Sequence, residues 1–165
     1  MPRPILLASR SEIRKTLLRN AGVTFEAVTP QIDEETVRDA MLAEHSSPGD
    51  IADKLAEMKA MKQSAKRPDA LVIGCDQVLS FQKSLLAKPG SQDEALIQLK
   101  QMRGKRHELL SAVVVCEDGR PTWRFIGTVR LVMRQVSDTY LTGYVARNWD
   151  SIRHSVGAYK LEEEG

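Results

Sequence analysis

Three side chains near the start of the chain have the types and spacing that suit an anion-binding turn. Ser11 stands between an apolar run at 5–7 and a helical pattern of apolar residues, and Arg14 and Lys15 follow it. As an N-cap, Ser11 leaves the first N–H groups of a helix free to donate to an anion. Cations in the first turn of a helix oppose the helix dipole, so two basic residues there indicate a phosphate site. The alternative is that both side chains simply extend into water.

An acidic residue follows a second apolar run. Residues 70–75 predict a buried strand, and Asp76 comes directly after the small residues Gly74 and Cys75. Ligands of open α/β sheets gather at the carboxyl ends of the strands. Asp76 is therefore the best candidate for a catalytic carboxylate, and the alternative is an aspartate that caps a turn.

Other charged residues are placed where an anion or a metal ion could meet them. Lys59 continues the apolar stripe of a predicted helix, so its ammonium either extends to solvent or meets an anion. Lys88 comes directly off a predicted strand and is followed by Pro89. The acids at 33–35 either stabilise a helix N-terminus or face a phosphate-bound Mg²⁺.

The elements that must position these residues alternate between strands and helices, which predicts an α/β fold. Predicted strands cover 5–7, 24–28, 70–75, 77–81, 84–87, 109–116, 123–126 and 128–133, with a short one near 158–159. Predicted helices cover 11–21, 36–44, 48–65 and 91–102, and a last one is capped by Ser137 with Tyr140, Leu141, Tyr144 and Val145 on its inner face.

Composition narrows the class of protein. The chain has 165 residues, 24 basic and 22 acidic side chains and two cysteines without metal-ligand spacing. This balance does not favour a nucleic-acid binder, and the cysteines predict buried free thiols. We expect no signal peptide and no membrane span, hence a cytoplasmic protein. Rossmann, P-loop and zinc-hydrolase motifs are absent, and the remaining charged residues suit metal-assisted phosphoanhydride chemistry.

Six short motifs in order resemble the Maf family of nucleotide pyrophosphatases, also called septum-formation Maf-like proteins. They are Ala8-Ser9-Arg10-Ser11 with the basic pair and Leu17-Leu18, Ile32-Asp33-Glu34, Lys59-Ala60, Gly74-Cys75-Asp76-Gln77, Ala87-Lys88-Pro89 and Gly104-Lys105-Arg106-His107. The resemblance implies one Maf-like domain over residues 1–165 with a mixed twisted sheet flanked by helices, two lobes and a central cleft. Because members usually continue past Gly165, we expect the family's C-terminal strand and helix to be missing.

The resemblance also implies the chemistry. A nucleoside triphosphate would be hydrolysed to a monophosphate and pyrophosphate with a divalent cation, Mg²⁺ or Mn²⁺. Asp76 would accept the proton, and it would hold the metal together with Glu34. The implied phosphate-binding residues are Ser9, Arg14, Lys15, Lys59 and Lys88.

Substrate choice is predicted from three positions. Gln77 and Glu162 resemble the branch that acts on 7-methyl-GTP, whereas Ile13 matches neither that branch nor the one that acts on dTTP and UTP. A carboxylate favours a base made positive by N7 methylation. Two alternatives stay open, a dTTP/UTP pyrophosphatase and a non-catalytic nucleotide-binding regulator of septum formation. We expect neither a nucleic-acid nor a membrane partner, and the resemblance points to a homodimer.

Overall fold

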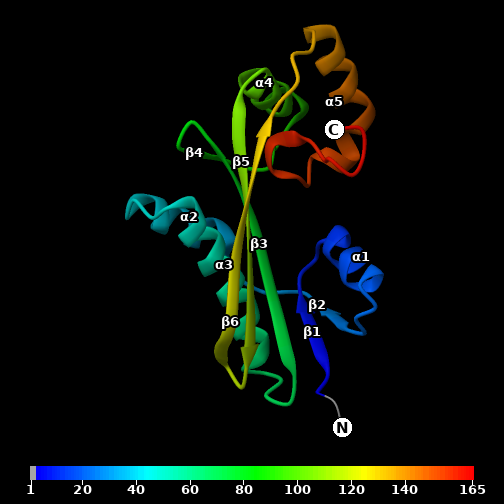
Figure 1. Ribbon diagram of the computed structural model, residues 1–165. Helices are drawn as coiled ribbons and strands as arrows, with labels where there is room; N and C mark the ends of the chain where they lie inside the picture. Colours follow the sequence, from blue (N-terminus) through cyan, green and yellow to red (C-terminus); the bar gives the residue numbers. More distant parts are fainter. Residues whose placement is uncertain (1–2) are drawn as a thin grey trace. The chain divides into compact units, whose positions relative to one another are not determined.

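The computed structural model describes residues 3–165, and Met1 and Pro2, where the absence of a signal peptide was predicted, lie outside the described part. The chain divides into two compact units: unit 1 contains the residues up to Asp76 and Ser111–Gly127, and unit 2 contains Gln77–Leu110 and Thr128–Gly165. Strands are β1 (Ile5–Ala8), β2 (Glu26–Val28), β3 (Leu71–Phe81), β4 (Ser84–Leu86), β5 (Arg106–Glu117) and β6 (Arg120–Val132) (Figure 1). Helices are α1 (Glu12–Asn20), α2 (Glu34–Ala43), α3 (Pro48–Ser64), α4 (Gln92–Met102) and α5 (Asp138–Ile152), followed by a 3-10 turn at Val156–Ala158.

The sheet of unit 1 has the strand order β2-β1-β3-β5-β6. Strand β1 lies parallel to both β2 and β3, with Leu7 opposite Ala27 on one side and Ile73 on the other. A central parallel strand is covered on both faces, and this explains why the run Leu6 to Ala8 is apolar without alternation. Together with the antiparallel pairing of β3 and β4, these contacts confirm the predicted mixed sheet flanked by helices.

Helix α3 packs against β3 at van der Waals distance. It buries eight residues, most of them small or aliphatic. A Cβ atom added to Gly74 of β3 would lie 2.1 Å from the Ala56 carbonyl oxygen and 2.8 Å from the Ala60 amide nitrogen. Only a residue without a side chain permits this approach, so Gly74 fixes the distance between α3 and the strand that carries Asp76.

Helix α1 is attached much more loosely. Ser11 is its N-cap, as predicted, and the Ser11 hydroxyl accepts from the Arg14 amide. None of its residues is buried, and Ile13 and Leu17 are 42% and 60% exposed. The helical spacing of these apolar residues is confirmed, but they are not buried, because no described element of unit 1 covers that side of the helix.

Unit 2 has its own hydrophobic core. Helices α4 and α5 pack together over the second half of β3, and the 3-10 turn closes the cluster with Ala158 and Tyr159. His107 of β5 is buried there, and its Nε2 lies 2.6 Å from the Tyr159 hydroxyl. Burial lowers the pKa of His107, so the imidazole is neutral at physiological pH.

Several predicted boundaries are wrong, each for a local reason. Strand β3 continues through Asp76, which lies in mid-strand instead of at a carboxyl end. The segments 123–126 and 128–133 form one strand, and 158–159 is not a strand because Gly157 has a φ of 78°. Helix α2 begins at Glu34 because Asp33 caps it. Tyr140 is 43% exposed, so only the other three residues of the predicted face of α5 are buried.

Both cysteines are free, as predicted. Cys116 is buried, and burial raises its pKa to about 11. Cys75 is only half-buried, which corrects the expectation of two buried thiols. In the described part of the chain, residues 3–165, no helix is long and apolar enough to span a membrane.

Candidate active site

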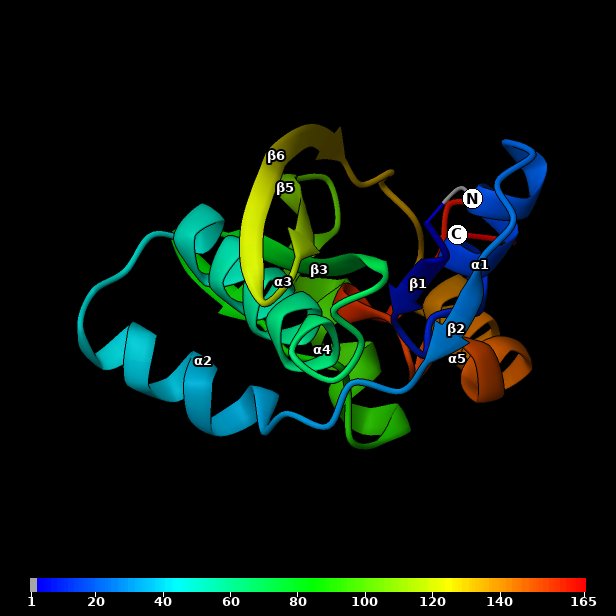
Figure 2. The same cartoon turned by 90° about the horizontal axis from the view of Figure 1, so that it is seen from below.

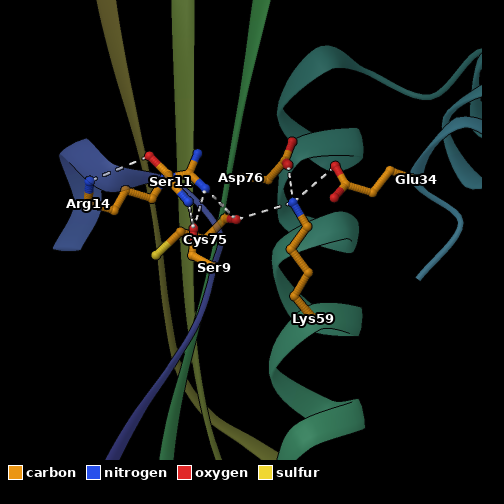
Figure 3. A network of polar contacts seen from close by, with 7 residues as sticks. All are labelled: Ser9, Ser11, Arg14, Glu34, Lys59, Cys75 and Asp76. Carbon is orange, nitrogen blue, oxygen red and sulfur yellow. Dashed lines mark hydrogen bonds and ion pairs between the residues drawn. The ribbon is translucent and has the colours of Figure 1, made fainter. Parts of the chain in front are cut away.

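A cluster of one lysine and two carboxylates in unit 1 joins α3, α2 and β3. Lys59 of α3 donates from Nζ to Asp76 Oδ1 at 2.7 Å, and the same Nζ lies 3.1 Å from Glu34 Oε2 (Figure 3). Lys59 and Asp76 are 5% and 6% exposed. The predicted inner-face position of Lys59 is therefore confirmed. Its ammonium meets two carboxylates that belong to segments distant in the sequence.

Asp76 has the environment of a proton acceptor. Its second carboxylate oxygen, Oδ2, is buried and has no hydrogen-bond partner within the described structure. Burial raises the pKa of Asp76, while the charge and hydrogen bond of Lys59 oppose that increase. A carboxylate whose pKa lies above its ordinary value is a stronger base than an exposed one, and its free oxygen can accept a proton.

The turn between β1 and α1 forms a second polar cluster beside Asp76. Arg14 donates from Nη1 to Ser9 Oγ at 3.3 Å and to the Cys75 carbonyl oxygen at 3.1 Å. The Ser11 amide donates to the same Ser9 hydroxyl at 3.2 Å. Within residues 3–165, Arg14 is in no ion pair with a carboxylate. Its charge is held by neutral acceptors alone, so it can still neutralise an anion.

The Cys75 carbonyl oxygen links the two clusters. Lys59 Nζ lies 3.5 Å from the oxygen that Arg14 contacts. A cation from α1 and a cation from α3 therefore meet at one peptide group, next to Asp76 in the sequence (Figure 3). The structure thus brings together five of the predicted site residues, namely Ser9, Arg14, Glu34, Lys59 and Asp76.

The other predicted site residues lie on α1, in β3 and in the loops of unit 2. Lys15 donates to Glu12 at 2.6 Å on the same helix turn. Lys88 is an exposed residue of unit 2, in the connection after β4. Of the predicted specificity residues, Ile13, Gln77 and Glu162 are all exposed. Gln77 follows Asp76 directly in β3 and begins unit 2.

Two contributors to the site were missed by sequence reasoning. The Cys75 carbonyl is a backbone group, and no side-chain pattern predicts it. Gly74 carries a usable signal, because a glycine inside an apolar strand indicates a close backbone approach. In this chain the approaching backbone is that of α3.

Comparison with known proteins shows the fold and the family of this chain. The fold is similar to that of a HAM1 protein from Coxiella burnetii, with a TM-score of 0.52 at 12% identity over 78% of this chain and 72% of that chain. Residues 4–165 match the family model described as Maf-like protein. The chain belongs to the Maf family, as its motifs predict.

Curated relatives carry enzyme names. A protein of Ruegeria pomeroyi named nucleoside triphosphate pyrophosphatase is 63% identical over 98% of this chain and 81% of its own length. A protein of Brucella abortus named 7-methyl-GTP pyrophosphatase is 40% identical over 98% of this chain and 81% of its own length. The predictions of the family and of an enzyme of the hydrolase class are confirmed by these relatives.

Proposed function

We propose that this protein hydrolyses a nucleoside triphosphate to a nucleoside monophosphate and pyrophosphate. The observation that carries the proposal is the buried Asp76 with an unbonded oxygen, flanked by Lys59 of α3 and Arg14 of α1. One base between two cations suits attack of water on a polyanion, because the cations offset the charge of the phosphates. The names of relatives such as the one from Ruegeria pomeroyi support the same substrate class.

The chemical step assigns one role to Asp76. Its free Oδ2 accepts a proton from water as the water oxygen bonds to the α-phosphorus. The bond from that phosphorus to the oxygen bridging to the β-phosphorus breaks, and pyrophosphate leaves with that oxygen. Lys59 keeps the carboxylate oriented through its contact to Oδ1.

The phosphates are bound by the cations and by the turn after β1. Arg14 and Ser9 already contact each other, so an incoming phosphate oxygen can replace Ser9 as acceptor without a large movement of the guanidinium. Free N–H groups at the start of α1 add donors. We assign Lys15, Lys59 and Lys88 to the same task.

A divalent cation fits the two acids of the site. Among residues 3–165 no group of three or more metal-ligating side chains is present. Mg²⁺, however, commonly uses one or two carboxylates together with substrate phosphates and water. Glu34 and the Asp76 carboxylate supply such a pair, because an ionised carboxylate has about four lone-pair sites and the described structure fills only the Oδ1 side of Asp76, with Lys59. Bound by these two residues, Mg²⁺ or Mn²⁺ would neutralise phosphate charge.

For the base we propose 7-methylguanine. The relative from Brucella abortus carries 7-methyl-GTP in its name. Glu162 is exposed and acidic, which suits a base that carries positive charge after N7 methylation. Ile13 and Gln77 are the other residues to which we assign base selection.

A triphosphate panel tests the activity and the base preference separately. Canonical triphosphates, including dTTP and UTP, and 7-methyl-GTP are each incubated with the protein and Mg²⁺ or Mn²⁺. We expect stoichiometric pyrophosphate and monophosphate, and the highest kcat/KM for 7-methyl-GTP. Release of single phosphates contradicts the reaction, whereas a preference for dTTP or UTP contradicts only the base assignment.

Lys88 is tested against a matched lysine of the same hairpin region. Lys88→Ala should raise KM and lower kcat, while Lys83→Ala, an exposed turn residue, should leave both unchanged. Equal effects of the two variants on kcat/KM contradict the phosphate-binding role of Lys88.

A further inference from the structure

The loop that carries Lys88 is held more firmly than an exposed loop requires. Residues 87–91 connect β4 to α4, and helix α4, drawn in green, continues the chain from this loop (Figure 2). Lys88 is exposed, and within residues 3–165 its ammonium has no hydrogen-bond or ion-pair partner. Its backbone, in contrast, lies between two contacts made by side chains of α4.

The first contact lies just before Lys88. Gln98 of α4 donates from Nε2 to the carbonyl oxygen of Ala87 at 3.0 Å. The other polar atom of the same amide, Oε1, is buried and has no partner in the described part of the chain. An unpaired buried acceptor costs free energy that an apolar side chain of similar shape would not cost. A local conflict of this kind often marks a residue with a functional task.

The second contact lies just after Lys88. Glu94 accepts at Oε2 from the Gly90 amide, at a distance of 2.7 Å. In the usual capping box, a glutamate at the third position of a helix accepts from the amide of the N-cap residue, which is Ser91 in α4. Here the carboxylate reaches one residue further, to the loop itself. Glu94 and Gln98 are four residues apart, so they lie on one face of α4 and hold the loop together.

The sequence of the loop removes most of its remaining freedom. Pro89 is buried, and its ring fixes its φ angle. A residue that precedes proline is restricted to extended conformations, and Lys88 is that residue. The Cα atom of Lys88 is therefore fixed by a carbonyl contact on one side and by a buried proline and an amide contact on the other. Only the torsions of the lysine side chain stay free.

Lys83 is an exposed lysine without such contacts. It lies in the turn between β3 and β4 with a φ of 67°. Among residues 3–165, no side chain is hydrogen-bonded to the backbone of Gln82 or Lys83. A lysine that is only solvated needs no fixed backbone. A lysine that binds a phosphate gains from one, because less conformational freedom is lost on binding.

We propose that Gln98 and Glu94 are positioning residues that hold Lys88 in place for the triphosphate. The inference rests on the phosphate-binding role proposed for Lys88. Neither of the two side chains contacts the substrate. Gln98 fixes the chain before the lysine, and Glu94 fixes the chain after it, so the ammonium needs little reorganisation to meet a phosphate oxygen.

Calorimetry tests the inference without turnover, with Mg²⁺ and a guanosine triphosphate analogue that has a methylene group between the α- and β-phosphorus atoms. Gln98→Met removes the donor at similar volume and should raise the Kd by about three- to tenfold. The free energy of unfolding should stay unchanged, because the same substitution removes an unpaired buried oxygen. Gln101→Met, at an exposed residue of the same helix, should leave the Kd unchanged. An equal Kd for the two variants overturns the proposal.

A double-mutant cycle separates positioning from general support of the fold. In the Lys88→Ala protein, Gln98→Met should have no further effect on the Kd, because the group that it positions is gone. An undiminished effect in that background overturns the proposal and leaves the phosphate-binding role of Lys88 in place. A Kd that Lys88→Ala itself does not change overturns both.

Glu94 is tested by two variants that differ in the acceptor. Glu94→Gln keeps an oxygen for the Gly90 amide, so it should bind the analogue as the unchanged protein does. Glu94→Met has no such acceptor and should raise the Kd by a factor similar to that of Gln98→Met. The cap of α4 is kept in both, because Ser91 accepts from the backbone amide of residue 94. Equal Kd values for the two variants overturn the positioning role of Glu94.

Discussion

The two helices that contribute cations to the candidate site are held in opposite ways. Helix α3 buries eight residues, with Lys59 among them, and its ammonium faces two carboxylates. Helix α1 buries none, and Arg14 contacts only a hydroxyl and a carbonyl. The difference teaches that similar charges beside one peptide group serve different tasks. In the proposed mechanism Lys59, besides binding phosphate, sets the protonation state of Asp76, whereas Arg14 has the substrate as its only charged partner.

The largest effect is expected from Asp76 itself, because the roles given to α3 and to α1 both depend on it as the proton acceptor. Asp76→Asn keeps the shape of the side chain and removes the proton acceptor, so kcat should fall about 10²- to 10⁴-fold. Triphosphate binding, measured by calorimetry, should persist because Arg14 is unchanged. Asp69→Asn is the control, at an exposed aspartate paired with Arg67. An unaltered kcat in Asp76→Asn would show that Asp76 is not the proton acceptor.

Arg14 should act on binding more than on turnover. A hydrogen bond to a charged group contributes about 1.5–3 kcal/mol, so Arg14→Ala should raise KM by roughly ten- to a hundredfold. Lys15→Ala should do less, because Lys15 is partnered by Glu12. Steady-state kinetics of the two variants separate these outcomes. If Arg14→Ala lowers kcat as strongly as Asp76→Asn does, the division of tasks between α1 and α3 is wrong.

Gly74 tests how closely α3 must approach β3. A methyl group at this position collides with the backbone of α3, and such overpacking lowers the free energy of unfolding by about 1–3 kcal/mol. Gly74→Ala should also lower kcat, since Lys59 is moved away from Asp76. Gly143→Ala is a matched control, because there the added Cβ meets only the flexible end of Arg147. Urea denaturation and kinetics on both variants check this; equal stability would show that α3 adapts.

The smallest effect is expected on the pH dependence of the free energy of unfolding. Burial raises the pKa of Asp76 in the folded protein above its value in the unfolded chain. The resulting contribution to the free energy of unfolding is complete below the unfolded pKa and is lost as pH rises through the folded pKa. Asp76→Asn should therefore flatten the decline of stability with pH, measured by urea denaturation between about pH 3 and about pH 7. Parallel curves for the two proteins would refute the raised pKa.

Much of this arrangement follows from local sequence. The cap at Ser11, the inner-face position of Lys59 and the end of one strand at residue 81 with the start of the next at residue 84 were all predicted, because each depends on neighbours within a few residues. The uninterrupted course of β3 was not predicted, since an acid in an apolar run indicates the end of a strand. Asp76 is tolerated there only because Lys59, 17 residues away, compensates its charge.

The exposed surfaces were the other failure of prediction. Apolar residues at helical spacing in α1 indicate a buried stripe, yet the structure leaves Leu17 in solvent. Strand β6 has no alternation that would mark it as one strand through Gly127. In α1 and in β6 the sequence indicates that the apolar residues favour burial. It does not identify the surface against which they would be buried.

The pH dependence of kcat in Lys59→Met tests whether Asp76 is the proton acceptor and whether Lys59 controls its pKa. The charge of Lys59 opposes the rise in the Asp76 pKa that burial causes. Removing that charge should move the acidic limb of the kcat profile to higher pH, while Lys62→Met on the exposed side of α3 should leave the limb in place. An acidic limb at the same pH in Lys59→Met and in the unchanged protein would contradict the account.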